Sequence, residues 1–233
     1  MLVSWFSAGL SSFLATYMLR NYVDRVVFID IPNHHPDTYR FIVDAEKMLG
    51  KPIEFLRSRE WASVDDVIER RRYINGPGGA PCTLLLKKRV REAWEREQGE
   101  PLEYIWGYDA GERRRANRLV QTMCEYRHRF PLIEQNMTKE QVHATCKALG
   151  IKRPAMYDMG YPNNNCIGCV KGGMGYWNAI RRDFPEVFER RARQEREIGH
   201  SCIRGVFLDE LETNRGRMEP IPECMGLCGE AGD

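Results

Sequence analysis

The sequence lacks the features that mark membrane, secreted and disordered proteins. No apolar run approaches the roughly 18 residues that a membrane-spanning helix needs, so we expect no transmembrane segment. Residues 1–6 carry neither a basic stretch nor a cleavage site, and we expect no signal peptide. A disordered chain is excluded because 42% of the residues are hydrophobic and the charges are spread along the chain.

An excess of charge of one sign is also absent. The 35 Lys and Arg against 33 Asp and Glu give a net charge of +2, so bulk charge neither favours nor excludes a nucleic-acid partner. The length of 233 residues suits one large domain, or one domain with a small appendage.

Cysteine is scarce overall but unevenly distributed. The eight cysteines are about 3% of the chain, far below the share found in a disulfide-stabilised scaffold. Without a signal peptide we expect a cytoplasmic, reducing environment, where paired cysteines bind metals or do redox chemistry more often than they form disulfides. Five of the eight lie between residues 166 and 233, an asymmetry that needs a chemical explanation.

Short apolar, β-branched runs alternate with helical patterns in the first part of the chain. We expect strands at 2–6, 25–31, 52–56 and 102–107, and helices at 13–20, 36–49, 63–72 and 83–97. This alternation predicts βαβ units, hence an α/β fold with a parallel sheet and helices on both faces. The pattern changes near residue 130, so we expect an α/β domain over 1–130 and a cysteine-bearing region over 131–233 packed on it.

Two further helices are expected after residue 130. The first begins at a capping box formed by Thr138 and Gln141. The second is a basic stretch over 176–197. Its arginines either form a solvated helix face or follow the phosphates of a tRNA or DNA substrate, since such contacts need local rather than net charge.

A loop rich in small residues separates the first strand from the first helix. Ser7, Gly9 and Ser12 there would present hydroxyls and backbone N–H groups at a helix N-terminus, which is a favourable place for an anion. Ligands of open α/β sheets lie at the carboxyl ends of the strands, where this loop is expected. On spacing alone, an ordinary strand-to-helix turn explains the pattern about as well.

Four segments in order resemble one known family. Residues 7–12, SAGLSS, are similar to the pyrophosphate-binding PP-loop (S-G-G-x-D-S) of the adenine nucleotide α-hydrolase-like superfamily, with Ala8 in place of a Gly and Ser11 in place of the Asp. Residues 28–38, 107–118 and 165–171 resemble further segments of the phosphoadenosine phosphosulfate (PAPS) reductase family, the last of them its C-x-x-C segment. Together these matches span about residues 1–190.

The resemblance implies a Rossmann-like PP-loop fold that binds an adenine nucleotide: ATP with Mg²⁺, or PAPS or adenylylsulfate. It places phosphate or sulfate oxygens at the loop, adenosine near the second strand, and the nucleotide's anionic end near the segment after the fourth strand. Arginine suits that last role because its planar fork can bind phosphate through two N–H groups. The implied nucleotide-binding residues are Ser7, Gly9, Ser11, Ser12, Asp30, Gly107, Glu112, Arg115 and Arg118.

The cysteines suggest a metal site. Cys166 and Cys169 lie in a Pro, Asn and Gly-rich loop where two thiolates can converge on one ion, and Cys82 is expected at the head of a helix, which favours its thiolate form. Together, Cys82, Cys166 and Cys169 resemble the cluster ligands of assimilatory adenylylsulfate reductases. Three ligands on a [4Fe-4S] cluster would leave one iron open, as in the PP-loop tRNA thiolases. There are two alternatives: Cys202 supplies a fourth ligand to the cluster, or the cysteines bind a structural Zn²⁺.

Other reactive groups are less distinctive. Cys224 and Cys228 either add ligands to a second metal site or include a nucleophile, because the segment around Cys224 faintly resembles the terminal E-C-G of PAPS reductases. Lys87 follows Cys82 by one to two helical turns and would neutralise cluster sulfides or nucleotide phosphates. Cys124 and Cys146 lie in helical patterns and are expected to be plain buried thiols.

Three functions follow from these patterns. The leading hypothesis is iron–sulfur-dependent thiolation, in which ATP adenylates a substrate and a sulfur species held at the open iron then displaces AMP. The second is a reductase that uses a thiol reductant and releases sulfite from PAPS or adenylylsulfate through a cysteine thiosulfonate. The third is a non-catalytic nucleotide-binding module with a structural Zn²⁺. The sequence leaves a homodimer open.

Overall fold

The structure is a computed structural model, and it describes residues 1–76 and 78–221. The chain forms two compact units, each made of several segments. The first unit comprises residues 1–30, 36–56 and 93–158, and the second comprises 31–35, 57–92 and 159–233. No helix in the described part of the chain is long and apolar enough to cross a membrane.

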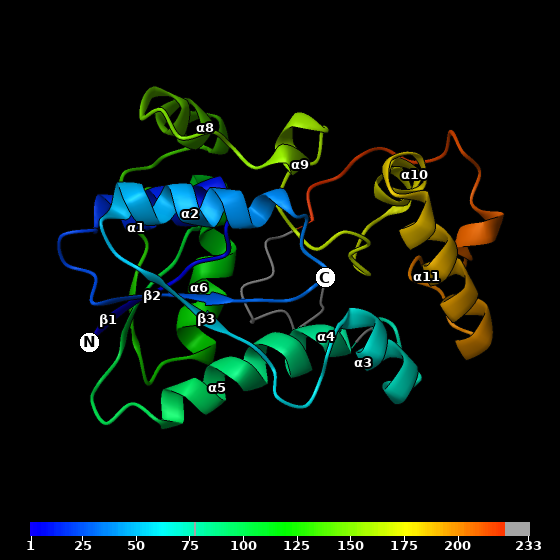
Figure 1. Cartoon of the computed structure of the whole chain (residues 1–233), viewed down its shortest axis with the longest axis horizontal. Helices are drawn as coiled ribbons and strands as arrows, with labels where there is room; N and C mark the ends of the chain where they lie inside the picture. The colour runs from blue at the N-terminus through cyan, green and yellow to red at the C-terminus, as the bar shows by residue number, and fades with distance from the viewer. Residues whose placement is uncertain (77, 222–233) are drawn as a thin grey trace. The chain divides into compact units, whose positions relative to one another are not determined.

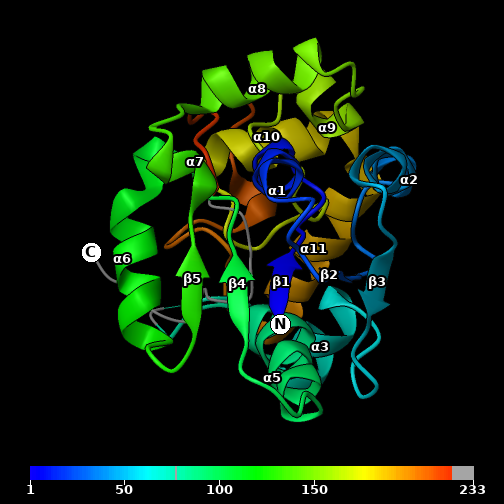
Figure 2. The same cartoon turned by 90° about the vertical axis from the view of Figure 1, so that its left-hand side faces the viewer.

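A five-stranded parallel sheet forms the centre of the first unit (Figure 2). Its strands are β1 (Leu2–Trp5), β2 (Arg25–Ile29), β3 (Ile53–Leu56), β4 (Glu103–Ile105) and β5 (Arg127–Arg129). The strand order is β3-β2-β1-β4-β5, and every neighbouring pair is parallel. The predicted α/β class with a Rossmann-like sheet is therefore confirmed. The fifth strand was not predicted, because an edge strand of sequence Arg-His-Arg carries no β-branched or apolar signal.

Helices cover both faces of the sheet. Two successive residues of β1 show this, because neighbouring side chains of a strand point to opposite faces. The Oγ of Ser4 lies 2.6 Å from the Oγ1 of Thr16 on α1 (Leu10–Met18). Trp5 points to the opposite face, where its ring packs edge-on against Trp94 of α5 (Arg89–Arg96) with centroids 5.4 Å apart. On the face of α1 lies α2 (Asp37–Leu49), which ends at Gly50 in the left-handed conformation that the sequence suggested (Figure 1).

The core around α1 explains why the first unit extends to residue 158. Phe13 of α1 belongs to the same buried cluster as Leu132, Val142 and Cys146. These residues come from α7 (Pro131–Glu134) and α8 (Lys139–Ala148), and the latter begins with the capping box predicted at Thr138. Residues 131–158 thus join the α/β core instead of the C-terminal region expected from residue 131 onward, because the apolar side of α8 packs on α1.

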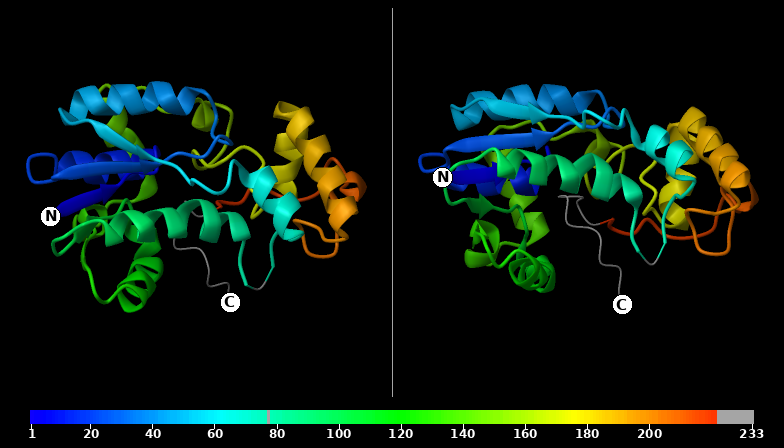
Figure 3. Two further views of the ribbon diagram at one scale, coloured as in Figure 1. Left: turned by 60° about the horizontal axis from the view of Figure 1, so that its bottom comes forward. Right: turned by 90° about the horizontal axis from the view of Figure 1, so that it is seen from below.

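The second unit is helical. Its elements are α3 (Val64–Arg71), α4 (Pro81–Thr83), a π-helical turn (Leu84–Lys88), α10 (Met174–Asp183), α11 (Pro185–Ile198) and a 3-10 turn (Leu208–Glu210). Helices α10 and α11 lie side by side (Figure 3). The single helix predicted over 176–197 was wrong, because Pro185 has no N–H to continue the first helix and restricts the backbone of Phe184 before it.

Most arginines of the 176–197 stretch have structural partners. Arg191 is 1% exposed and donates to Asp65 of α3 at 3.0 Å and to Gln194 at 2.9 Å. Arg190 reaches the other oxygen of the same carboxylate at 3.4 Å. Arg196 pairs with Asp209 at 2.8 Å. These arginines therefore hold α11 against its neighbours, which weakens the case for a phosphate-binding face there.

The two arginines on Asp65 provide a matched test of stability. Arg191→Met should lower the free energy of unfolding by about 3 kcal/mol, because it breaks a buried ion pair and leaves the Asp65 carboxylate with only one of its two arginine partners. Arg190→Met, at a side chain 40% exposed, should cost less than about 1 kcal/mol. Urea unfolding of both variants measures the difference, and equal losses would contradict the assignment.

Candidate nucleotide-binding site

The loop after β1 lies at the point where the order of the strands in the sheet reverses. From β1 the chain adds β2 and β3 on one side and β4 and β5 on the other. The strand order therefore reverses between β1 and β4, and in open α/β sheets the crevice outside the carboxyl ends at such a point is where ligands bind. Residues 6–9 and 106–109 are the connections that leave β1 and β4, and all of them belong to the first unit.

The hydroxyl of Ser12 gives the β1–α1 loop its shape. It accepts hydrogen bonds from the backbone N–H of Ser7 at 3.1 Å and from the Ser7 hydroxyl at 2.9 Å, and it donates to the carbonyl of Gly9 at 3.0 Å. Ser7 and Ser12 were both predicted to hold an anion directly. The structure brings them together and engages the hydroxyl of Ser12 within the loop itself, so that Ser12 is a positioning residue.

The N-terminus of α1 lies directly behind this loop. Gly9 is the N-cap residue with extended backbone, no side chain caps the helix, and Ser11 is buried in the first turn. The N–H of Leu10 donates to the hydroxyl of Tyr157 at 3.3 Å. The helix dipole makes this end positive, so the loop can stabilise a phosphate or sulfate group. Tyr157 has no motif around it, and sequence analysis missed it.

Gly107 packs its backbone against the first turn of α1. A methyl group at this position would lie 2.5 Å from both Cα and N of Ser12 and 2.8 Å from the carbonyl carbon of Ser11. Real side chains essentially never approach backbone so closely, so only glycine allows the β4 connection to lie against the first turn of α1. The predicted site residue Gly107 therefore fixes the distance between the β4 connection and the loop.

The segment after Gly107 forms a small capped turn. Asp109 accepts the N–H of Gly111 at 2.9 Å, and Glu112 reaches back to the N–H of Asp109 at 3.4 Å. Glu112 also pairs with Arg115 three residues later. The guanidinium of Arg115 lies 4.7 Å from the ring centre of Tyr108. Glu112 and Arg115 thus lie together, and their role beside an anionic ligand stays a prediction.

Two other predicted residues differ in their surroundings. Arg118 is exposed on α6 (Arg113–Thr122). Asp30 directly follows β2, is 3% exposed, and accepts a hydrogen bond from the hydroxyl of Tyr39 at 2.8 Å. Its N–H donates to the carbonyl of Leu56 at 2.8 Å. Asp30 therefore lies at the carboxyl edge of the sheet, and the nucleotide-binding roles of Asp30 and Arg118 stay predictions.

In the second unit, Tyr176 organises the C-x-x-C loop. Its hydroxyl accepts the N–H of Cys169 at 2.8 Å and donates to the carbonyl of Cys166 at 3.1 Å. Burial raises the pKa of Tyr176, and the nearby thiols add to that rise. This hydroxyl therefore stays protonated and holds the two cysteines in one turn. The sequence marked the cysteines but not this tyrosine.

The other cysteines of the second unit have distinct surroundings. Cys82 is half-buried at the start of α4, at the head of a helix as predicted. Cys202 is buried and its N–H donates to Glu195 at 2.5 Å. Burial raises the pKa of the Cys202 thiol, and Glu195 and Cys169 add to that rise. Cys146 of the first unit is buried as expected, whereas Cys124 is exposed.

Asn75 connects the segments that carry these cysteines. Its side chain donates to the carbonyl of Val170 at 3.3 Å, and its own carbonyl lies 2.7 Å from His200 Nε2. Within 1–76 and 78–221, no group of three His, Cys, Asp or Glu side chains is placed to hold a metal ion. The described residues therefore do not by themselves fit a three-ligand cluster. Cys224 and Cys228 lie outside the described residues.

Lys87 lies near His34, a neighbour that the sequence did not indicate. It is half-buried on the π-helical turn and lies close enough to His34 to lower the pKa of that imidazole. Burial is the larger cause, and together they lower the pKa of His34 to about 3. His34 is therefore neutral at physiological pH.

The contact at Gly107 gives a first prediction for the site. Gly107→Ala should lower the free energy of unfolding by at least about 2 kcal/mol, because the methyl group meets rigid backbone and not a movable side chain. Gly99→Ala is the matched control, since a methyl group there meets nothing within 4 Å. Urea unfolding measures both, and a neutral Gly107→Ala variant would show that the β4 connection does not lie against the first turn of α1.

Ala8 gives a second prediction. It adopts a φ of 58°, a left-handed conformation that costs a non-glycine residue roughly 1–2 kcal/mol. Ala8→Gly relieves this strain but loses a buried methyl group worth about 0.8 kcal/mol. The variant should therefore be as stable as the parent or up to ~1 kcal/mol more stable, whereas Ala8→Val should be clearly less stable. Thermal unfolding checks this order.

Comparison with known proteins shows what this arrangement resembles. No family model and no curated protein matches the chain. Among solved structures, it is similar to PAPS reductase from Candida auris in a phosphate complex, with a TM-score of 0.52 and 16% sequence identity. The match covers 71% of this chain and 80% of that protein. The likeness is one of fold: this chain has the Rossmann-like α/β architecture of a PAPS reductase.

Proposed function

We propose that this protein binds an adenine nucleotide, with a phosphate or sulfate group at the β1–α1 loop. The observation that carries the proposal is the loop itself: Ser12 and Gly107 hold it at the crevice between β1 and β4. The fold likeness to a PAPS reductase supports the same ligand class. The motif resemblance at residues 7–12 supports it independently.

The residues around the crevice would divide the binding. Backbone N–H groups of the loop and the positive end of α1 would face the phosphate or sulfate oxygens. Arg115, held by Glu112, would add a cation near the anionic end of the nucleotide. Asp30, buried at the end of β2, would hydrogen-bond hydroxyl or amino groups of the adenosine.

Nucleotide titration tests this proposal. ATP, AMP, adenylylsulfate and PAPS would each be titrated calorimetrically, and at least one should bind saturably. Ser12→Ala should weaken that binding about tenfold, which corresponds to ~1.4 kcal/mol, because it removes the hydroxyl that closes the loop. Thr122→Ala, at an exposed hydroxyl of α6, should leave it unchanged. Equal affinities of the two variants would place the nucleotide elsewhere.

For the reaction, sulfur transfer to an adenylated substrate is our first candidate. A carbonyl oxygen of the substrate attacks the α-phosphorus of ATP, and pyrophosphate leaves. A sulfide-level donor then forms a C–S bond as the C–O bond breaks, and AMP departs with the oxygen. No net oxidation or reduction is needed. The loop would stabilise charge on the phosphoryl group being transferred.

Reduction of a sulfonated nucleotide is the second candidate, and the fold likeness to PAPS reductase favours it. A cysteine thiolate attacks the sulfur of PAPS or adenylylsulfate, so that an S–S bond forms, the S–O bond breaks, and the nucleotide leaves. A dithiol then reduces the thiosulfonate, releasing sulfite and becoming a disulfide. Cys224 and Cys228, outside the described residues, are the candidate nucleophiles.

Product analysis separates the two reactions. Sulfite release that depends on a thiol reductant, without pyrophosphate, would establish reduction, and Cys224→Ser or Cys228→Ser should then abolish it. Pyrophosphate and AMP formed only with a sulfur acceptor present would establish thiolation. Neither product with any tested nucleotide, despite binding, would favour a non-catalytic nucleotide-binding module.

The cysteines of the second unit give a further prediction about metal content. The predicted ligands Cys82, Cys166 and Cys169, with or without Cys202, are not brought together as a metal site among the described residues. We therefore expect protein purified without oxygen to contain no stoichiometric iron with sulfide, and no stoichiometric zinc, and the cysteines to act as redox or structural thiols. Metal analysis checks this. A stoichiometric metal that Cys166→Ser loses and Cys124→Ser, at an exposed cysteine of the first unit, keeps would contradict this expectation and support the predicted [4Fe-4S] or Zn²⁺ site.

A further inference from the structure

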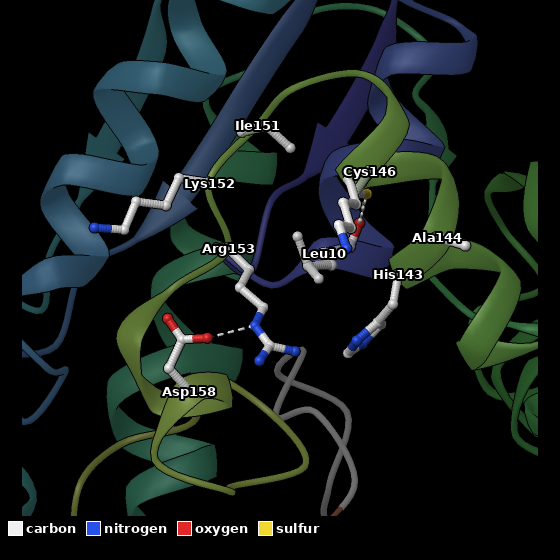
Figure 4. Close-up of a pocket in the computed structure, with 9 residues that line it drawn as sticks. Leu10, His143, Ala144, Cys146, Ile151, Lys152, Arg153 and Asp158 are labelled. Carbon is white, nitrogen blue, oxygen red and sulfur yellow. Dashed lines mark hydrogen bonds and ion pairs between the residues drawn. The ribbon is translucent and has the colours of Figure 1, made fainter.

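A cavity of about 450 Å³ opens beside the N-terminus of α1 (Figure 4). Its walls come from α1, α8, the connection after α8, and α9 (Ala155–Asp158), all within the first unit. The apolar part of the lining is Leu10, Ala144, Cys146 and Ile151. The polar part is His143, Lys147, Lys152, Arg153 and Asp158. A volume of this size suits a small organic ligand or part of one.

The charges around the cavity are predominantly positive. Among the residues that the structure describes, three cations line it and Asp158 is the only acid in the lining, and its carboxylate accepts a hydrogen bond from the Nε of Arg153 at 2.6 Å. Leu10 is the first residue of α1, so the positive end of the helix dipole also faces this region. An anion is therefore the kind of ligand that the cavity favours.

Two side chains converge across the cavity. His143 and Arg153 point toward one another from opposite sides, while Asp158 lies on the far side of Arg153 (Figure 4). The Nε2 atom of His143 is buried and has no hydrogen-bond partner among the described residues. A buried polar atom is normally satisfied, so this nitrogen calls for a ligand or water between it and Arg153.

Charged groups around His143 shift its pKa in both directions. Burial lowers the pKa of His143, and Lys139 and Arg153 lower it further, while Glu140 and Asp109 oppose them. The ring packs edge-on against Tyr157, whose hydroxyl accepts the N–H of Leu10. An oxyanion bound between His143 and Arg153 would reverse the effect of the two cations and raise the pKa of His143.

We propose that this cavity binds a phosphate- or sulfate-bearing group between His143 and Arg153, next to the nucleotide loop. Arginine and an imidazole N–H donate well to tetrahedral oxyanions, and Lys147 and Lys152 add positive charge around them. The apolar walls would contact the rest of the molecule that carries the group. The inference rests on this cavity alone and does not require the proposed nucleotide site.

Sulfate is the first probe, because its charge does not change over the pH range of a histidine titration. The pKa of His143 would be measured by NMR, with the signal assigned from the His143→Gln spectrum and ionic strength matched with chloride. Sulfate should raise that pKa saturably. No rise, or a rise that chloride reproduces, would overturn the proposal.

Two variants separate ligand binding from bulk charge. Arg153→Gln and Lys139→Gln each remove a cation that lowers the pKa of His143, but only Arg153 lines the cavity. Both should raise the pKa of His143 without sulfate. Arg153→Gln should weaken the sulfate effect about tenfold, whereas Lys139→Gln should leave its half-saturating concentration within about twofold of the parent. Equal weakening in both would contradict a site at Arg153.

ATP and PAPS then identify the source of the group. If saturating nucleotide raises the pKa of His143 and displaces sulfate, the cavity holds a group of the nucleotide itself. If sulfate still binds to the nucleotide-loaded protein, the cavity takes a separate oxyanion. Ser12→Ala should weaken nucleotide binding and leave sulfate at His143 unaffected. The nucleotide proposal and the cavity proposal can therefore fail separately.

Discussion

The close approach of Gly107 to the first turn of α1 is the constraint on which the candidate site depends. It brings the connection after β4 into van der Waals contact with the first turn of α1, at the point where the strand order reverses. Ser12 lies at that contact and also holds the loop through Ser7 and Gly9. One backbone contact thus sets the position of the β4 connection relative to the loop.

Buried polar groups join the segments of the second unit, beside its buried apolar residues. Arg191 and Asp65 join α11 to α3, and Gln194 adds a hydrogen bond to Glu69 at 2.9 Å. Glu195 is fully buried and binds the N–H groups of Cys202 and Leu208. Such networks are sensitive to the loss of any one member, because an unpaired group would stay buried.

Positive charge is used differently in the two units. In the second unit the arginines of α11 are mostly neutralised by acids on neighbouring segments. In the first unit, Lys147, Lys152 and Arg153 line a cavity in which the described part of the chain places a single acid. The unit with the phosphate-type loop therefore also carries the surplus of positive charge near the N-terminus of α1. An anionic ligand is the chemistry that both features favour.

The sequence by itself determined the parallel α/β fold, the loop after the first strand, and the bounds of β1 to β4 to within two residues, because these depend on local periodicity and small residues. It failed at β5 and at Pro185, where a charged edge strand and a helix break carry little signal in a window of apolar residues. Only the tertiary structure decided that residues 131–158 join the α/β core, that α11's arginines are paired, and that His143 faces Arg153. These features depend on contacts between segments distant in sequence, which no local pattern encodes.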